Sequence, residues 1–124
     1  EIKQASPSEK QIYKGAFSAS DIAATYEASG ADAISVLTDT RYFKGSYDYL
    51  HQARSATQQV PLLMKDFIVD EYQIYFARYH GADAILLIVA LLTENQINSF
   101  IEIANSLGMA ALLKFIISRN WKAP

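Results

Sequence analysis

The stretch PLLMKDFIVD, residues 61–70, decides the fold of this chain. Apolar residues stand on both sides of a single lysine and aspartate pair, Lys65 and Asp66. Parallel strands carry apolar residues at nearly every position because both of their faces are covered. We therefore predict a buried strand over residues 60–66, with Lys65 close to its carboxyl end.

Lys65 admits two interpretations. In the structural one, its ammonium points into water where the strand leaves the sheet. In the functional one, a half-buried lysine at the carboxyl end of a barrel strand donates a proton or anchors a substrate, since burial and neighbouring charges shift its pKa. The spacing alone favours the structural interpretation, because structural lysines are common. The rest of the chain decides between the two.

Helix and strand signals alternate on both sides of this stretch. Two capping boxes, Asp70 with Gln73 and Thr93 with Gln96, mark the starts of helices downstream. Glycines follow the helical patterns as stops. The predicted strands span residues 1–5, 32–38, 60–66, 83–89 and 110–117, and the predicted helices span 18–30, 46–57, 70–81 and 93–108, with an aromatic loop at 41–45.

An internal repeat supports this alternation. The pentapeptide GADAI occurs at residues 30–34 and again at 81–85, each time between a helix stop and a strand. Strict alternation with short loops predicts an α/β fold with a parallel sheet, either doubly wound or closed as a barrel. Neither a GxGxxG motif after the first strand nor a GxxxxGKS/T motif occurs, which weighs against a nucleotide-binding sheet.

Chain length adds a further restriction. A complete (β/α)8 barrel takes about 250 residues, so about four and a half βα units in 124 residues predict roughly half of one. We expect residues 1–113 to form this part of a barrel and residues 114–124 to form a divergent tail. Half a barrel leaves strand edges unpaired, so self-association through these edges is a further expectation.

The composition excludes several classes of protein. Apolar residues make up 51% and charged residues 19%, as in globular rather than disordered chains. The net charge of -2 gives no basic surface for nucleic acid, and the lack of cysteine excludes thiolate metal sites. No apolar run reaches the ~18 residues of a membrane helix. We therefore expect no nucleic-acid partner and no membrane partner.

Several conspicuous residues receive structural interpretations. His51 and His80 fall on predicted helices, where surface or capping roles are commoner than metal ligation, and no ligand grouping has metal spacing. Asp32 and Asp83 lie at the amino ends of predicted strands, which is the stability face of a barrel. Four aromatic residues of the helix over 70–81 are expected to pack rather than to stack on a ligand: Tyr72, Tyr75, Phe76 and Tyr79.

Four groups of strand-end motifs resemble one known family. They are EIKQASPS at residues 1–8, SVLTD at 35–39 with RYFKGSYDYL at 41–50, PLLMKDFIVDEYQI at 61–74 and GADAILLIVALL at 81–92. In this order and spacing they resemble indole-3-glycerol phosphate synthase, a (β/α)8 barrel lyase of tryptophan biosynthesis, up to about residue 113. The family closes an indole ring on 1-(2-carboxyphenylamino)-1-deoxyribulose 5-phosphate, with loss of carbon dioxide and water. The resemblance implies a partial barrel, a small phosphorylated substrate, no cofactor, no metal and a cytoplasmic location.

The resemblance also implies roles for individual residues. Lys65 corresponds to the general acid that protonates the substrate carbonyl as the ring carbon attacks it. Lys3 corresponds to the lysine that pairs with the anthranilate carboxylate and assists the later dehydration, and Glu1 to the glutamate that orients it. The remaining matches bind the substrate: Ser6 by direct contact, and Phe43, Phe67 and Leu86 as the apolar wall around the aromatic ring.

The chain also departs from the family pattern. The family's fifth strand carries a glutamate general base where this chain has Lys114, and residues 115–124 show no match. Strands six to eight with their phosphate-binding loops, and the segment that covers the active-site mouth, are also missing. We therefore expect a truncated or frame-shifted product or a partial gene model.

Two other readings stay open at this point. In one, the chain is a catalytically incomplete structural fragment that needs a second copy or a partner to cover its strand edges. In the other, it is a different phosphate-sugar barrel such as phosphoribosylanthranilate isomerase, although that family would not supply the KDF lysine together with EIK and SPS.

Overall fold

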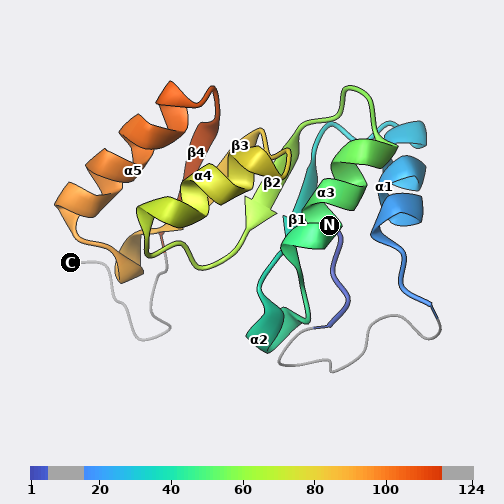
Figure 1. Ribbon diagram of the computed structural model, residues 1–124, viewed down its shortest axis with the longest axis horizontal. Helices are drawn as coiled ribbons and strands as arrows, with labels where there is room; N and C mark the ends of the chain where they lie inside the picture. Colours follow the sequence, from blue (N-terminus) through green and yellow to red (C-terminus); the bar gives the residue numbers. More distant parts are fainter. Residues whose placement is uncertain (6–15, 116–124) are drawn as a thin grey trace, which may run out of the picture.

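The computed structural model of the chain describes residues 1–5 and 16–115. Ser6, a predicted substrate-binding residue, lies outside the described residues, as does most of the predicted tail. Strands and helices alternate as the sequence predicts (Figure 1). The strands are β1 (Ile34–Leu37), β2 (Leu62–Lys65), β3 (Ala84–Ile88) and β4 (Ala110–Lys114), and the helices are α1 (Ala19–Ala28), α2 (Thr40–Phe43), α3 (Tyr47–Ala56), α4 (Glu71–Tyr79) and α5 (Glu94–Ser106), with a 3₁₀ turn η1 (Val89–Leu91).

The four strands form one parallel sheet in the order β1-β2-β3-β4. At their carboxyl ends Leu37 pairs with Lys65 on β2, and Ile88 of β3 pairs with Lys114 on β4. Ile2 adds a parallel bridge to β1 on the edge away from β2. Within the described residues, the strand expected over residues 1–5 is therefore present only as this single bridge.

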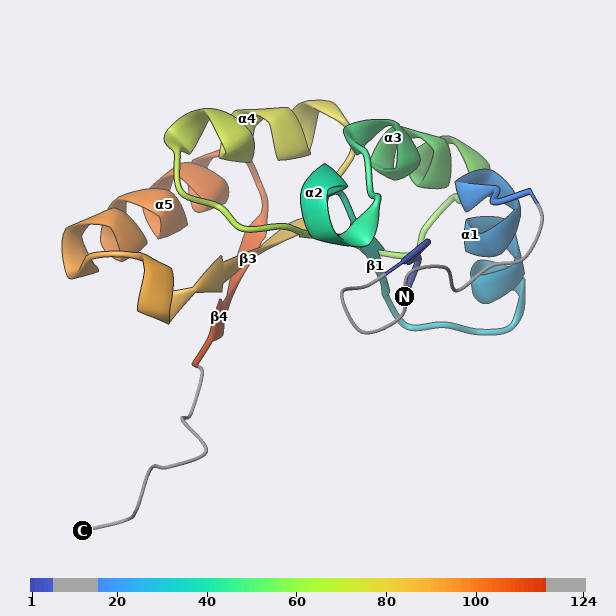
Figure 2. The same cartoon turned by 90° about the horizontal axis from the view of Figure 1, so that it is seen from below.

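The helices follow one another in an arc along one side of the sheet (Figure 2). A doubly wound sheet carries helices on both faces, whereas a barrel carries them only on its outside. The face of the sheet that lies away from the helices, called here the inner face, is therefore the inside of the barrel. The predicted α/β fold class, a partial (β/α)8 barrel, is confirmed.

The core lies between the sheet and this layer of helices. Side chains alternate along β1, β2 and β3, so the residues of these strands that point at the helices are buried. Each aliphatic side chain of this kind contributes ~1.5–3 kcal/mol when fully buried. The core centres on Val36, Met64, Ile85 and Leu87 from the strands and Leu50, Ile74 and Phe100 from the helices.

Within the described residues, no helix is long and apolar enough to span a bilayer.

Capping side chains start the helices where the sequence predicts. Asp70 and Gln73 form a full capping box at α4, and Thr93 and Gln96 form another at α5. In each box the side chain of the first residue accepts a backbone N–H and the glutamine side chain binds the backbone N–H of the capping residue. Four helical N–H groups otherwise lack partners, so these boxes define the two helix starts.

The loop predicted over residues 41–45 is partly wrong, because the structure forms α2 there. The Asp39 carboxylate accepts the Tyr42 N–H at 2.9 Å at its start, and Lys44 ends it in the left-handed conformation with φ 50°. A Cβ on Gly45 would collide with the backbone of Leu37, so only glycine fits the tight turn that follows. A helix of one turn leaves no periodic pattern in the sequence to predict it from.

The aromatic residues of α4 do not enter the core. Ile74 and Ala77 take the buried face of the helix, while Tyr79 is 84% exposed. The Phe76 and His80 rings lie 5.2 Å apart between centroids. The expected packing therefore takes place among rings at the surface, because one helix face holds only residues three or four apart.

Candidate active site

The bridge at Ile2 positions the first two charged residues of the site. Ile2 donates its N–H to the Ser35 carbonyl at 2.8 Å and accepts the Leu37 N–H at 3.1 Å. The Ile2 side chain is only 1% exposed, within the core between the sheet and the helices. Glu1 and Lys3 therefore project from the opposite side, the inner face, because successive side chains of an extended segment alternate.

Strand β2 brings Lys65 to the same place. Its Nζ lies 2.7 Å from Oε2 of Glu1, and Nζ of Lys3 lies 3.8 Å from Oε1 of the same carboxylate. The structure thus brings together the three residues predicted to be catalytic, with one carboxylate between two ammonium groups. We call Glu1, Lys3 and Lys65 the lysine–glutamate cluster.

The cluster keeps the Glu1 carboxyl ionised. Burial alone tends to raise the pKa of Glu1, but hydrogen bonds from Lys65 and Ser35 and the positive charges of Lys65 and Lys3 outweigh it, so the pKa falls below its ordinary value of 4.5. The three side chains stay 30 to 35% exposed. At neutral pH the site therefore presents a carboxylate with two lysines that water and a ligand can reach.

An apolar slot opens beside the cluster. It has a volume of about 140 Å³ and is walled by the three apolar residues predicted to hold an aromatic ring: Phe43, Phe67 and Leu86. Lys65 borders the slot from β2, and Lys114 borders it from the end of β4. The carboxyl groups of Asp39 and Asp66 border the slot as well. A flat apolar ring suits its apolar walls, and an anionic group on the ring would be stabilised at the part of the rim where it meets an ammonium.

A hydrogen bond between Asp66 and Thr38 also shapes the site. Asp66 accepts the Thr38 hydroxyl at 2.8 Å on one oxygen and the Phe67 N–H at 2.7 Å on the other. Burial raises the pKa of Asp66, and the negative charge of Asp39 adds to this, although the two hydrogen bonds act in the opposite direction. This carboxyl links the ends of β1 and β2 directly after Lys65. It lies inside the KDF motif, but nothing in that motif indicates its partner on β1.

Comparisons with known proteins identify the family of the chain. A family model described as indole-3-glycerol phosphate synthase matches residues 1–120. The chain belongs to the indole-3-glycerol phosphate synthase family. Curated relatives of that name include those of Neisseria meningitidis serogroup B (strain MC58), 53% identical over 114 residues, and Acaryochloris marina, 50% identical over 114 residues. The aligned part is 92% of this chain but only 43% and 37% of these relatives, so the chain spans about two fifths of their length.

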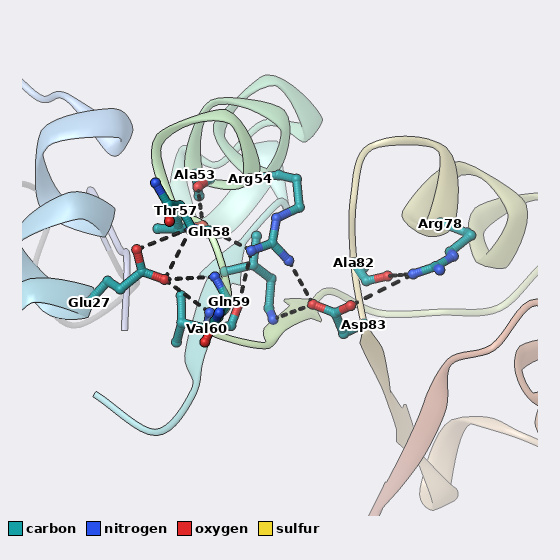
Figure 3. Close-up of polar contacts among 11 residues, drawn as sticks. Glu27, Ala53, Arg54, Thr57, Gln58, Gln59, Val60, Arg78, Ala82 and Asp83 are labelled. Carbon is teal, nitrogen blue, oxygen red and sulfur yellow. Dashed lines mark hydrogen bonds and ion pairs between the residues drawn. The ribbon is translucent and has the colours of Figure 1, made fainter. Parts of the chain in front are cut away.

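A second polar network in this family member lies at the amino ends of the strands (Figure 3). Asp83, directly before β3, accepts Arg54 Nη1 at 2.8 Å and the buried Leu62 N–H at 2.9 Å on Oδ2, while Arg78 Nη1 lies 3.7 Å from Oδ1. The Glu27 carboxylate accepts the N–H groups of residues 58, 59 and 60 at 3.0 to 3.1 Å. We call Glu27, Arg54, Arg78 and Asp83 the amino-end network. Its place agrees with the expected structural role of Asp83.

Neither histidine joins the lysine–glutamate cluster. His51 is exposed on α3, and His80 follows α4 with Nδ1 2.8 Å from the Phe76 carbonyl, a position at the helix end. Among residues 1–5 and 16–115, no group of three or more histidine, aspartate or glutamate side chains could hold a metal ion.

Proposed function

We propose that this chain supplies the proton-donating and ring-binding part of an indole-3-glycerol phosphate synthase active site. The observation that carries the proposal is the Lys65 ammonium 2.7 Å from the Glu1 carboxylate, at the border of an apolar slot. The whole protein would be a cytoplasmic carboxy-lyase of tryptophan biosynthesis that works on a small phosphorylated substrate without a cofactor or a metal. Nucleic acid and membrane would not be partners.

In the proposed reaction, Lys65 acts first. The ring carbon that bears the carboxylate of 1-(2-carboxyphenylamino)-1-deoxyribulose 5-phosphate attacks the carbonyl carbon, and Lys65 donates a proton to the carbonyl oxygen. Carbon dioxide then leaves with its bonding electrons returning to the ring, and loss of water completes the indole. Positioned proton donation of this kind contributes about 10²- to 10⁴-fold to a rate.

The other residues hold the substrate. Lys3 would pair with the anthranilate carboxylate, since an ammonium has three donors and its distance of 3.8 Å from Glu1 leaves room to turn toward a ligand. Glu1 would orient both lysines. The aromatic ring would be enclosed by Phe43, Phe67 and Leu86. We propose Ser6 as a substrate contact on the basis of the resemblance alone.

A second candidate function is favoured by Lys114. This lysine borders the slot at the position where the family has a glutamate base, and the chain spans only about two fifths of its relatives. On that reading the chain holds only part of the catalytic set and associates with another copy through the β4 edge. Leu112 on β4 and Phe115 directly after it are 49% and 69% exposed, and an exposed edge strand offers its backbone groups to another chain. The division between a barrel part (residues 1–113) and a tail (residues 114–124) belongs to the same proposal.

Turnover by the purified chain separates the two candidates. We expect chromatographically detected indole-glycerol phosphate from the native chain, a loss of at least about 100-fold in Lys65→Met, and no change in Lys44→Met. The control removes an exposed lysine by the same substitution. Product that persists at the native rate in Lys65→Met would contradict the role of Lys65, and a native chain without product would establish the incomplete piece.

A further inference from the structure

We propose that Ser35 is a positioning residue that fixes the Glu1 carboxylate between the two lysines of the cluster. Its hydroxyl donates to Oε2 of Glu1 at 3.1 Å, the same oxygen that Lys65 approaches to 2.7 Å. The inference rests on the proposed function, in which Glu1 orients Lys3 and Lys65. It adds a residue to which the sequence motifs attach no role.

The fold itself sets Ser35 beside Glu1. Ile34 and Val36, its neighbours on β1, are 1% and 0% exposed in the core, so Ser35 projects from the inner face. The Ile2 N–H bond to the Ser35 carbonyl then sets Glu1 level with Ser35 on the adjoining segment. Two adjacent side chains on one face of paired segments lie within contact distance by geometry alone.

A short side chain on a strand is a better anchor than a lysine. The terminal torsion of a glutamate is broad, so its two oxygens exchange places easily without a fixed donor. Lys65 has four rotatable side-chain bonds, whereas Ser35 has one and sits on paired backbone. The hydroxyl therefore determines which oxygen faces Lys65 and leaves Oε1 toward Lys3, 3.8 Å away.

The charges around Glu1 come from two elements. Lys65 faces it from β2 and Lys3 from its own segment, while Tyr26 of α1 donates its hydroxyl to the Glu1 backbone carbonyl at 3.2 Å. Ser35 is neutral and acts only through its hydrogen bond, which lowers the pKa of Glu1. Loss of the hydroxyl should therefore raise that pKa without changing the net charge of the site.

The decisive experiment compares three variants of the full chain: Ser35→Ala, Ser35→Thr and, as a control, Ser55→Ala on the exposed face of α3. NMR titration of the Glu1 side-chain carboxyl should give an upward pKa shift in Ser35→Ala only. Ser35→Thr keeps the hydroxyl and suits a strand, so it should titrate like the native chain. In turnover, Ser35→Ala should lower kcat about fivefold with KM nearly unchanged, and Ser35→Thr should restore it.

Each result decides one claim. A Glu1 titration in Ser35→Ala that coincides with that of the native chain overturns the role of Ser35, whatever the activity. A native chain without turnover overturns the proposed function for this chain, but the titration still tests the contact between Ser35 and Glu1. A Ser35→Thr chain that behaves like Ser35→Ala would also contradict the inference, since the hydroxyl would then not be the operative group.

Discussion

At the amino ends of the strands, Asp83 joins two arginines and a backbone N–H, whereas at the carboxyl ends Glu1 joins two lysines and a serine hydroxyl. Arginine presents a rigid fork of donors, and an acceptor bonded to backbone cannot turn away. Lysine is a mobile point charge with three donors. One carboxylate with two basic side chains therefore forms a rigid structural network at the amino ends of the strands and a mobile, adaptable site at the carboxyl ends.

The surroundings of the amino-end network and of the lysine–glutamate cluster also differ. The amino-end network ties α1, α3 and α4 to the segments before β2 and β3, and Glu27 accepts three consecutive backbone N–H groups. The lysine–glutamate cluster instead stands beside an apolar slot. We expect substitutions at the amino ends to act on stability and substitutions at the carboxyl ends to act on ligand binding and chemistry.

The largest effect on stability is expected at Asp83. Asp83→Ala leaves the buried Leu62 N–H without its acceptor and separates two arginines from their carboxylate, so we expect a loss of about 2 kcal/mol in the free energy of unfolding. Asp32→Ala is the matched control, because Asp32 holds the same place in the first GADAI copy and is exposed. Urea denaturation measures both. Equal losses in the two variants would show that the contacts of Asp83 with the arginines and the Leu62 N–H do not account for the effect.

A smaller effect is expected at Lys114. If the missing carboxylate limits turnover, Lys114→Glu should raise kcat by about tenfold, because it places a general base at the rim of the slot opposite β2. Lys114→Gln, which removes the charge without adding a base, is the control. A gain in Lys114→Gln as large as in Lys114→Glu would show that the lysine charge, rather than the lack of a base, was limiting.

The smallest effect is a pH dependence at Glu27. Backbone hydrogen bonds from Val60, Gln59 and Gln58 hold the pKa of Glu27 below its ordinary value of 4.5. The ionised carboxylate therefore stabilises the fold above that value, and the contribution disappears as pH falls through the lowered pKa. Unfolding midpoints in urea between about pH 6 and about pH 3 should fall less steeply in Glu27→Gln than in the native chain. Identical slopes in the two chains would contradict the stabilising role of Glu27 in the amino-end network.

Periodicity and capping residues predicted most of the fold. Both capping boxes start helices as expected, and the strand predicted around Lys65 is present as β2. The motif residues of the lysine–glutamate cluster and the slot also meet, because parallel strands bring their carboxyl ends to one edge. Local sequence signals were sufficient to predict a helix or strand wherever its own residues provide a start signal, a stop signal and an apolar face.

The remaining features depend on contacts between distant segments. The contact of Ser35 with Glu1 follows from the register of residues 1–5 against β1, which no local pattern encodes. The link from Thr38 to Asp66 joins two strand ends 28 residues apart. Helix α2 depends on one cap and one tight turn around Gly45 rather than on periodicity. Such features become visible only in the folded chain.

The central claim is that the carboxyl ends of the strands bind the ligand and the amino ends stabilise the fold. The most direct test measures binding of 2-(phenylamino)benzoate, an aromatic carboxylate without a phosphate group, so no phosphate-binding site is required. Fluorescence titration should give saturable binding to the native chain, about tenfold weaker binding to Lys3→Gln, and native affinity in Asp83→Asn chains that remain folded. Such a result would assign ligand binding to the carboxyl ends and stability to the amino ends. Native affinity in Lys3→Gln, or no saturable binding to the native chain, would contradict the account.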